Sequence, residues 1–259
     1  AGLSLGFLLR SLVFTGFTHV SADDLDGALQ LALLEHWRNV FTGAGSAPWN
    51  TPNFFHPVPD TLGYNDGYLL LGIVFTAFRG LGLDALLAQE FTQVAFRIAG
   101  FLGLWVLVRR CFGGSIPAAA FAAMLFTVAH PNALSLLHSQ LTLVGLTPWV
   151  FVLASVVLEA LRSGRAWPAF LGMVGLALLM GVWILSGFYT VWFTVVLMLF
   201  GALVILLAWR PVAMPYMRAL LRPRLLGATA AWASRRRRNS PASGTSCSKE
   251  MQLPTTLGA

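Results

Sequence analysis

The chain has 259 residues, of which 57% are hydrophobic and only 10% are charged. Soluble globular proteins carry about 25% charged residues, so this composition excludes a soluble protein and indicates a polytopic membrane protein. The formal net charge is +7, but the arginines flank apolar stretches, so we interpret them as orientation signals and expect no nucleic-acid partner. The two cysteines, Cys111 and Cys247, indicate neither a disulfide framework nor a thiolate metal site.

Six apolar segments are predicted to cross the membrane, because a helix needs about 20 apolar residues to span a hydrocarbon core of ~30 Å. They cover residues 1–20, 87–108, 116–129, 141–161, 166–185 and 189–209. We therefore expect an all-α fold, a polytopic transmembrane helical bundle with about six spans and external juxtamembrane helices. Residues 1–210 would form this transmembrane module, and residues 211–259 a basic, largely disordered cytoplasmic tail.

A shorter apolar stretch, residues 68–78, decides the predicted topology. A helix of that length measures roughly 16 Å, about half a bilayer. If it crossed the membrane, the basic clusters around Arg109 and Arg162 and the basic tail would share a side with the acidic loop, against the positive-inside tendency. We therefore predict that it lies in the interface, with residues 21–83 forming an external loop.

Three acidic residues, Asp23, Asp24 and Asp26, stand where the first predicted span leaves the membrane. Carboxylates this close repel one another, so they need a cation, a proton or hydrogen bonds. Hard oxygen ligands suit Mg²⁺ or Mn²⁺, and a carboxylate at the membrane boundary can act as a general base. Asp24 or Asp26 is equally suited to cap the amphipathic helix predicted at residues 27–41. The residues alone leave both readings open.

The second predicted span carries Glu90, Gln93 and Arg97 at positions i, i+3 and i+7, which share one helical face. Ionisable residues inside a membrane usually face the bundle and have partners. Arg97 offers a planar fork of donors to phosphoryl oxygens, but a structural pair of Glu90 with Arg97 is the alternative. On the next external loop, His130 and His138 have no recognised metal-ligand spacing, so we interpret them as loop histidines that could face the same cleft as Asp24.

These motifs resemble, in order and spacing, the GT-C superfamily of integral membrane glycosyltransferases. The resemblance covers roughly residues 1–210 and rests on the Asp24-Leu25-Asp26 motif, the interfacial helix, the Phe-His-Pro loop at His56, the short second helix and the span that ends at Arg109 and Arg110. It implies a polyprenyl-phosphate-linked sugar donor. It also implies that Asp24 or Asp26 is the catalytic acidic residue of an external cleft, where it activates the acceptor or holds a divalent ion.

The same resemblance implies that His56 and the Asn65-Asp66 turn line this cleft, and we add Arg97 and Glu90 to the expected substrate-binding residues. We accordingly expect a glycosyltransferase, or the N-terminal part of one, in a bacterial inner membrane, with membrane lipid and the lipid-linked donor as partners. The alternative is a non-catalytic helical subunit of a membrane assembly or a transporter-like bundle. A transporter is disfavoured because the last three predicted spans carry almost no polar residues.

Overall fold

The computed structural model describes residues 26–45, 47–50, 58, 60–129 and 138–208, with a few single helical positions near either end. Every regular element in this part of the chain is a helix, which confirms the all-α prediction. The α-helices are α3 (Asp26–Thr42), α4 (Leu69–Gly80), α5 (Ala85–Cys111), α6 (Ile116–Val128), α8 (Thr147–Arg162), α9 (Ala166–Ile184) and α10 (Phe188–Ala208), and two 3-10 helices are η1 (Thr61–Tyr64) and η2 (Ser139–Leu146).

Four helical stretches among the described residues are long and apolar enough to cross a membrane, which indicates an integral membrane protein. They are Ala85–Cys111, Ser139–Arg162, Ala166–Ile184 and Phe188–Ala208. The prediction of about six spans is not confirmed: α6 has only 13 residues, and the predicted span at residues 1–20 lies almost wholly outside the described residues. Most of the predicted tail also lies outside them.

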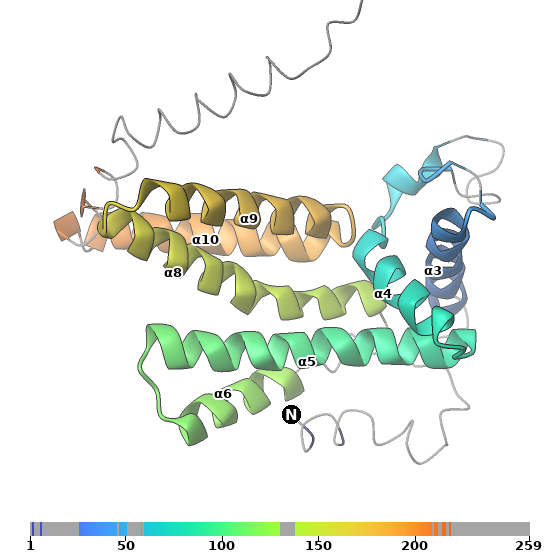
Figure 1. The fold of residues 1–259 in the computed structure, drawn as a ribbon, viewed down its shortest axis with the longest axis horizontal. Coiled ribbons are helices and arrows are strands. Elements are labelled where there is room, and N and C mark those ends of the chain that lie inside the picture. The colour runs from blue at the N-terminus through green and yellow to red at the C-terminus, as the bar shows by residue number, and fades with distance from the viewer. Residues whose placement is uncertain are drawn as a thin grey trace, which may run out of the picture.

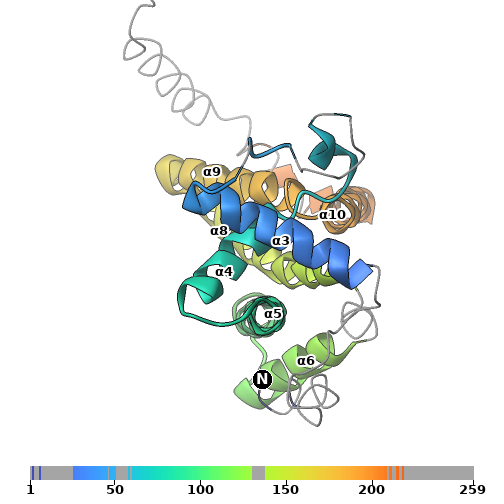
Figure 2. The same cartoon turned by 90° about the vertical axis from the view of Figure 1, so that its right-hand side faces the viewer.

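The long helices α5, α8, α9 and α10 run side by side, and α3 and α4 gather at one end of this bundle (Figure 1). Viewed from that end, α3 lies across the bundle while α5 is seen end-on (Figure 2). The short apolar stretch forms α4, whose 12 residues make it too short to count among the candidate spans. Two shorter helices, α3 and α4, therefore lie as a pair at one end of the bundle, and their external juxtamembrane position stays a prediction.

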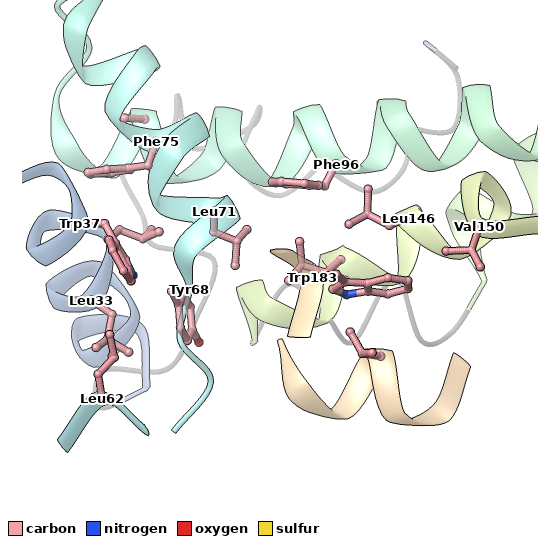
Figure 3. Packing of buried hydrophobic residues seen from close by; sticks show 14 residues of the cluster. Leu33, Trp37, Leu62, Tyr68, Leu71, Phe75, Phe96, Leu146, Val150 and Trp183 are labelled. Carbon is pink, nitrogen blue, oxygen red and sulfur yellow. The ribbon is translucent and has the colours of Figure 1, made fainter. Parts of the chain in front are cut away.

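Trp37 holds α3 against α4. Its ring is 3% exposed and packs against Gly72 of α4, where a Cβ atom would collide with the Trp37 side chain. Its indole Nε1 donates to the Gly67 carbonyl oxygen at 2.5 Å. Leu71 and Phe75, both fully buried, extend this contact into the core of the bundle (Figure 3). The apolar face of α3 is therefore buried against α4 at this end of the bundle.

Two glycines let η2 approach α5 closely. A Cβ atom on Gly100 would lie 2.9 Å from the Gly145 Cα, and one on Gly145 would lie 2.5 Å from the Phe96 carbonyl oxygen. Just beyond, Trp149 Nε1 donates to the Ala99 carbonyl oxygen at 2.8 Å. Since real Cβ atoms essentially never come this close to other atoms, only glycine fits at these positions without a shift of the helices.

The predicted basic clusters share the end of the bundle opposite to α3. Arg110, at the end of α5, forms an ion pair with Glu159 near the end of α8. Arg162 ends α8, and Arg165 directly precedes α9. Arg109 lies at the same end, and the positive-inside tendency predicts that this cluster of arginines is cytoplasmic.

Cysteine labelling tests this orientation with a cysteine that the chain already has. Cys111 is free and exposed beside the arginines, and Ala44 is exposed just after α3. In a Cys247→Ser background, a membrane-impermeant maleimide should label Cys111 only after the cells are permeabilised. Ala44→Cys, combined with Cys111→Ser and Cys247→Ser, should react in intact cells. Labelling of Cys111 in intact cells would contradict the predicted orientation.

Candidate functional site at the α3 end of the bundle

Asp26, in the first turn of α3, meets the loop that leads into η2. Its Oδ2 atom lies 3.5 Å from His138 Nδ1, and both side chains are about half exposed. One turn further along α3, Gln30 Oε1 accepts a hydrogen bond from the Ser139 backbone N–H at 2.9 Å. These contacts join segments more than 100 positions apart in the chain, so η2 begins directly beside the first turn of α3.

Tyr68 and Gln140 extend this group toward the start of α10. The Tyr68 hydroxyl donates to Gln140 Oε1 at 2.5 Å. The side chain of Asp66 lies close to that of Gln140, and its Oδ1 accepts from the Phe188 backbone N–H at 2.7 Å. We use the name polar cluster for Asp26, Gln30, Asp66, Tyr68, His138, Ser139 and Gln140.

Burial raises the pKa of two members of the polar cluster. The Asp66 carboxyl is 4% exposed, and this burial raises its pKa, although the hydrogen bonds from Phe188 and Gln140 oppose the effect. Burial likewise raises the pKa of the Tyr68 phenol, and the negative charges of Asp66 and Asp26 add to the effect. Tyr68 is therefore a hydrogen-bond donor at neutral pH and not a base.

A face of α5 carries polar side chains into the bundle at the depth of η2. Gly145 of η2 touches Gly100 of α5. Ser139 stands six residues before Gly145 in η2, which corresponds to about 12 Å along a 3-10 helix. About eight residues of α-helix cover the same rise, so Ser139 lies level with the turn between Gln89 and Gln93. These two glutamines and Gly100 recur four and seven positions apart, which places them on the face of α5 toward η2.

The buried side chains on this part of α5 are unusually polar for a span. Gln89 and Gln93 are each 1% exposed, and Glu90 and Arg97 are each 3% exposed. Arg97 Nη2 donates to Gln93 Oε1 at 3.5 Å, and Glu90 interacts with Arg97 electrostatically. Within the described part of the chain, neither polar atom of the Gln89 amide has a hydrogen-bond partner. Such a group is costly in a membrane unless a polar ligand or water satisfies it.

Neither the protein-family models, nor the curated proteins, nor the solved structures gave a match. The arrangement of the described residues therefore carries the functional argument.

The structure brings together some of the predicted site residues. Asp26 and Asp66 both act on Tyr68, so these two belong to one group, and His138 contacts Asp26. Glu90 and Arg97 lie further along, on α5. Asn65 lies beside Asp66 and its Oδ1 accepts from the Asp66 backbone N–H at 2.9 Å.

Other predicted residues cannot be placed in the site. Asp24, His56 and His130 lie outside the described residues. Within the described ranges, no group of three or more His, Cys, Asp or Glu side chains could hold a metal ion. Asp26 and His138 alone offer one carboxylate and one imidazole, whereas Mg²⁺ prefers several oxygen ligands in octahedral geometry. The expected divalent ion, Mg²⁺ or Mn²⁺, stays a prediction that depends on Asp24.

Three buried polar residues were not predicted from the sequence: Gln30, Tyr68 and Gln89. Gln30 stands on the otherwise apolar face of α3, between the buried positions Gly27 and Leu33, and a buried glutamine on such a face is a recognisable signal for a buried polar contact. Gln89 directly precedes Glu90, so it falls outside the i, i+3, i+7 pattern but is still buried. The sequence predicts Tyr68 only as the first residue of the short apolar stretch, residues 68–78.

The raised pKa of Asp66 predicts a pH-dependent stability. The folded state holds the Asp66 proton more tightly than the unfolded state, whose ordinary value is 3.8. The free energy of unfolding should therefore fall as the pH rises from about 4 through the raised pKa. Asp66→Asn keeps the carbonyl oxygen that accepts from Phe188 and removes the ionisation, so it should abolish this loss in thermal unfolding of the detergent-solubilised protein. The control, Asp60→Asn at an exposed position, should retain the loss, and an unchanged pH profile in Asp66→Asn would contradict the assignment.

Proposed function

We propose that this chain is a membrane glycosyltransferase of the GT-C type, or the N-terminal module of one, that transfers a sugar from a polyprenyl-phosphate donor at the external face of a bacterial inner membrane. The observation that carries the proposal is the contact of Asp26 with His138 at the end of the bundle, joined to the Gln30 contact with η2. A half-exposed carboxylate at the membrane boundary can reach a water-soluble acceptor and a lipid-linked donor at once.

In the proposed reaction Asp26 is the general base. The acceptor hydroxyl oxygen attacks C1 of the donor sugar, the hydroxyl proton passes to the Asp26 carboxylate, and the bond from C1 to the phosphate oxygen breaks. Polyprenyl phosphate leaves with the electron pair of that bond. His138, 3.5 Å from Asp26, is placed to orient the carboxylate.

Arg97 is the proposed ligand of the donor phosphate. Side chains of an α-helix point back toward its N-terminus, and Arg97 accordingly reaches Gln93 one turn nearer to the α3 end. With 27 residues, α5 is about 40 Å long, which exceeds the hydrocarbon core, so its first turns reach the headgroup region. Arg97 lies 12 positions, about 18 Å, along α5 from Ala85, so the donor phosphate would meet the guanidinium below the headgroup level, inside the bundle. Gln89 lies nearer to that end of α5 and offers an amide to the sugar or the phosphate.

A measurement of donor binding distinguishes phosphate binding by Arg97 from a structural ion pair between Glu90 and Arg97. Arg97→Lys keeps the charge but loses the planar fork, so it should weaken binding of a short-chain polyprenyl-phosphate sugar by about tenfold, whereas Glu90→Gln should be comparatively mild. Binding is measured by tryptophan fluorescence or by native mass spectrometry in nanodiscs.

Arg109→Lys is the matched control, because Arg109 is exposed at the opposite end of the bundle, and this variant should bind the donor like the wild type. If Arg97→Lys and Glu90→Gln both lower the unfolding temperature but leave donor affinity intact, the pair is structural and the phosphate role of Arg97 is wrong.

A further inference from the structure

A pocket of about 380 Å³ opens beside the polar cluster, between the loop before α4 and the turn from α9 to α10. Its polar lining comes from Asn65 and Asp66, and its aromatic lining from Trp49, Phe188 and Tyr189. The three aromatic side chains are between 43% and 60% exposed. The volume falls near the lower end of the range for small-ligand sites, which suits one or two sugar rings.

The walls of this pocket are fixed by buried contacts. Trp49 packs edge-on against the buried Trp37, with ring centroids 5.9 Å apart. Trp37 in turn holds Gly67 through its indole N–H, and Gly67 lies so close to the Leu185 carbonyl that a Cβ atom would collide there. On the other side, the Asp66 carboxyl anchors the first residue of α10. A ligand would therefore enter a preformed site and order little of it.

The lining has the chemistry that recognises a saccharide. The C–H groups on one face of a pyranose ring are weakly electropositive and pack against the negative face of an aromatic ring. The amide of Asn65 and the carboxyl of Asp66 offer donors and acceptors to sugar hydroxyls at the same place. A lipid acyl chain would cover the exposed Asn65 amide without replacing its hydrogen bonds to water, and this cost would oppose its binding.

The pocket and the proposed catalytic carboxylate belong to one connected structure. Asp66 on the pocket wall lies close to Gln140, while His138 contacts Asp26. Gln140 and His138 are two positions apart, so their Cα atoms are separated by no more than about 7 Å. The start of η2 therefore links the pocket wall at Asp66 to the carboxylate of Asp26.

We infer that this pocket binds a sugar ring of the acceptor, so that the acceptor is a saccharide and not a polypeptide or a lipid alcohol. The inference rests on the proposed function only in naming the bound saccharide an acceptor. Binding in the pocket does not need the transfer reaction, and it is measurable without a donor.

Saturation-transfer NMR tests the pocket directly. The full chain is reconstituted in nanodiscs free of sugar-based detergent and mixed with methyl glycosides of glucose, galactose, mannose and N-acetylglucosamine, and with their β-linked disaccharides. At least one of these probes should receive saturation on its ring protons. Trp49→Ala and Tyr189→Ala should each weaken its binding by about five- to tenfold, because each removes a stacking surface.

Two further variants make the result specific. Tyr189→Phe keeps the ring and should retain most of the binding. Trp167→Ala removes a tryptophan that is 57% exposed at the start of α9, at the opposite end of the bundle, and should bind like the wild type.

Absence of binding with every probe, or equal binding by Trp49→Ala, Tyr189→Ala and Trp167→Ala, would overturn the inference. Neither outcome contradicts the proposed transfer reaction, which is tested separately by product formation. Conversely, saccharide binding by a protein that transfers no sugar would support the pocket and count against the proposed function.

Discussion

Asp26→Asn should lower the rate of sugar transfer by about 10²- to 10⁴-fold, the usual contribution of a general base. The amide has nearly the same volume as the carboxylate but cannot accept the acceptor proton. Asp26 is half exposed, so the substitution should leave the unfolding temperature close to that of the wild type. The rate is measured as release of polyprenyl phosphate by the protein in liposomes, at saturating donor.

Asp60→Asn provides the matched control for this variant. Asp60 is an exposed carboxylate near the same end of the bundle, so its amide variant should transfer at the wild-type rate. Full activity in Asp26→Asn would remove the catalytic reading of this residue. Asp26 would then serve only to favour the positive end of the α3 dipole.

Gly145→Ala should destabilise the bundle by about 1–3 kcal/mol, since the new methyl group forces η2 away from α5. The collision is with the backbone: the added Cβ would lie 2.5 Å from the Phe96 carbonyl oxygen and 3.3 Å from Gly100 Cα and N. Neither neighbour can move without shifting a helix. The measurement is the midpoint of unfolding in detergent.

Gly175→Ala is the control for a glycine without such a contact. Gly175 lies within α9, and a Cβ atom there meets nothing within 4 Å. Alanine favours the helix over glycine by about 0.8–1.0 kcal/mol in peptides, so this variant should be neutral or slightly stabilised. Equal destabilisation by the two substitutions would mean that the close approach of η2 to α5 does not determine the packing.

The sequence predicted the long helices well because their signal is local. The segments predicted at residues 166–185 and 189–209 became α9, Ala166–Ile184, and α10, Phe188–Ala208. The short stretch at residues 68–78 became α4, Leu69–Gly80. Run length and apolar content suffice for such elements, since the bilayer sets the length that a span needs.

Local patterns did not reveal the 3-10 helix that precedes α8. Residues 141–161 were predicted as one span, but the helical stretch starts at Ser139 and its first eight residues form η2. Gly145 lies in this element and allows its close approach to α5. The periodicity of hydrophobic residues does not indicate such a contact.

The candidate site was predictable only residue by residue. Charged residues beside or inside apolar segments are costly, so they usually have a partner or a function. On this ground the sequence singles out Asp26, Asp66, Glu90 and Arg97. The contacts that join them were not predictable, because the Ser139 N–H meets Gln30 across 109 positions and Phe188 N–H meets Asp66 across 122. Such pairs follow from how helices pack, and a single sequence does not record the partner.

The central claim is transfer of sugar from a lipid-linked donor, and the most direct measurement is product formation by the purified chain. The protein in liposomes is given a panel of polyprenyl-phosphate sugars together with saccharide acceptors, and glycosylated acceptor and free polyprenyl phosphate are quantified. The proposal predicts that both products form in equal amounts with at least one donor and that both are lost in Asp26→Asn. A folded protein that forms neither product with any donor would contradict it.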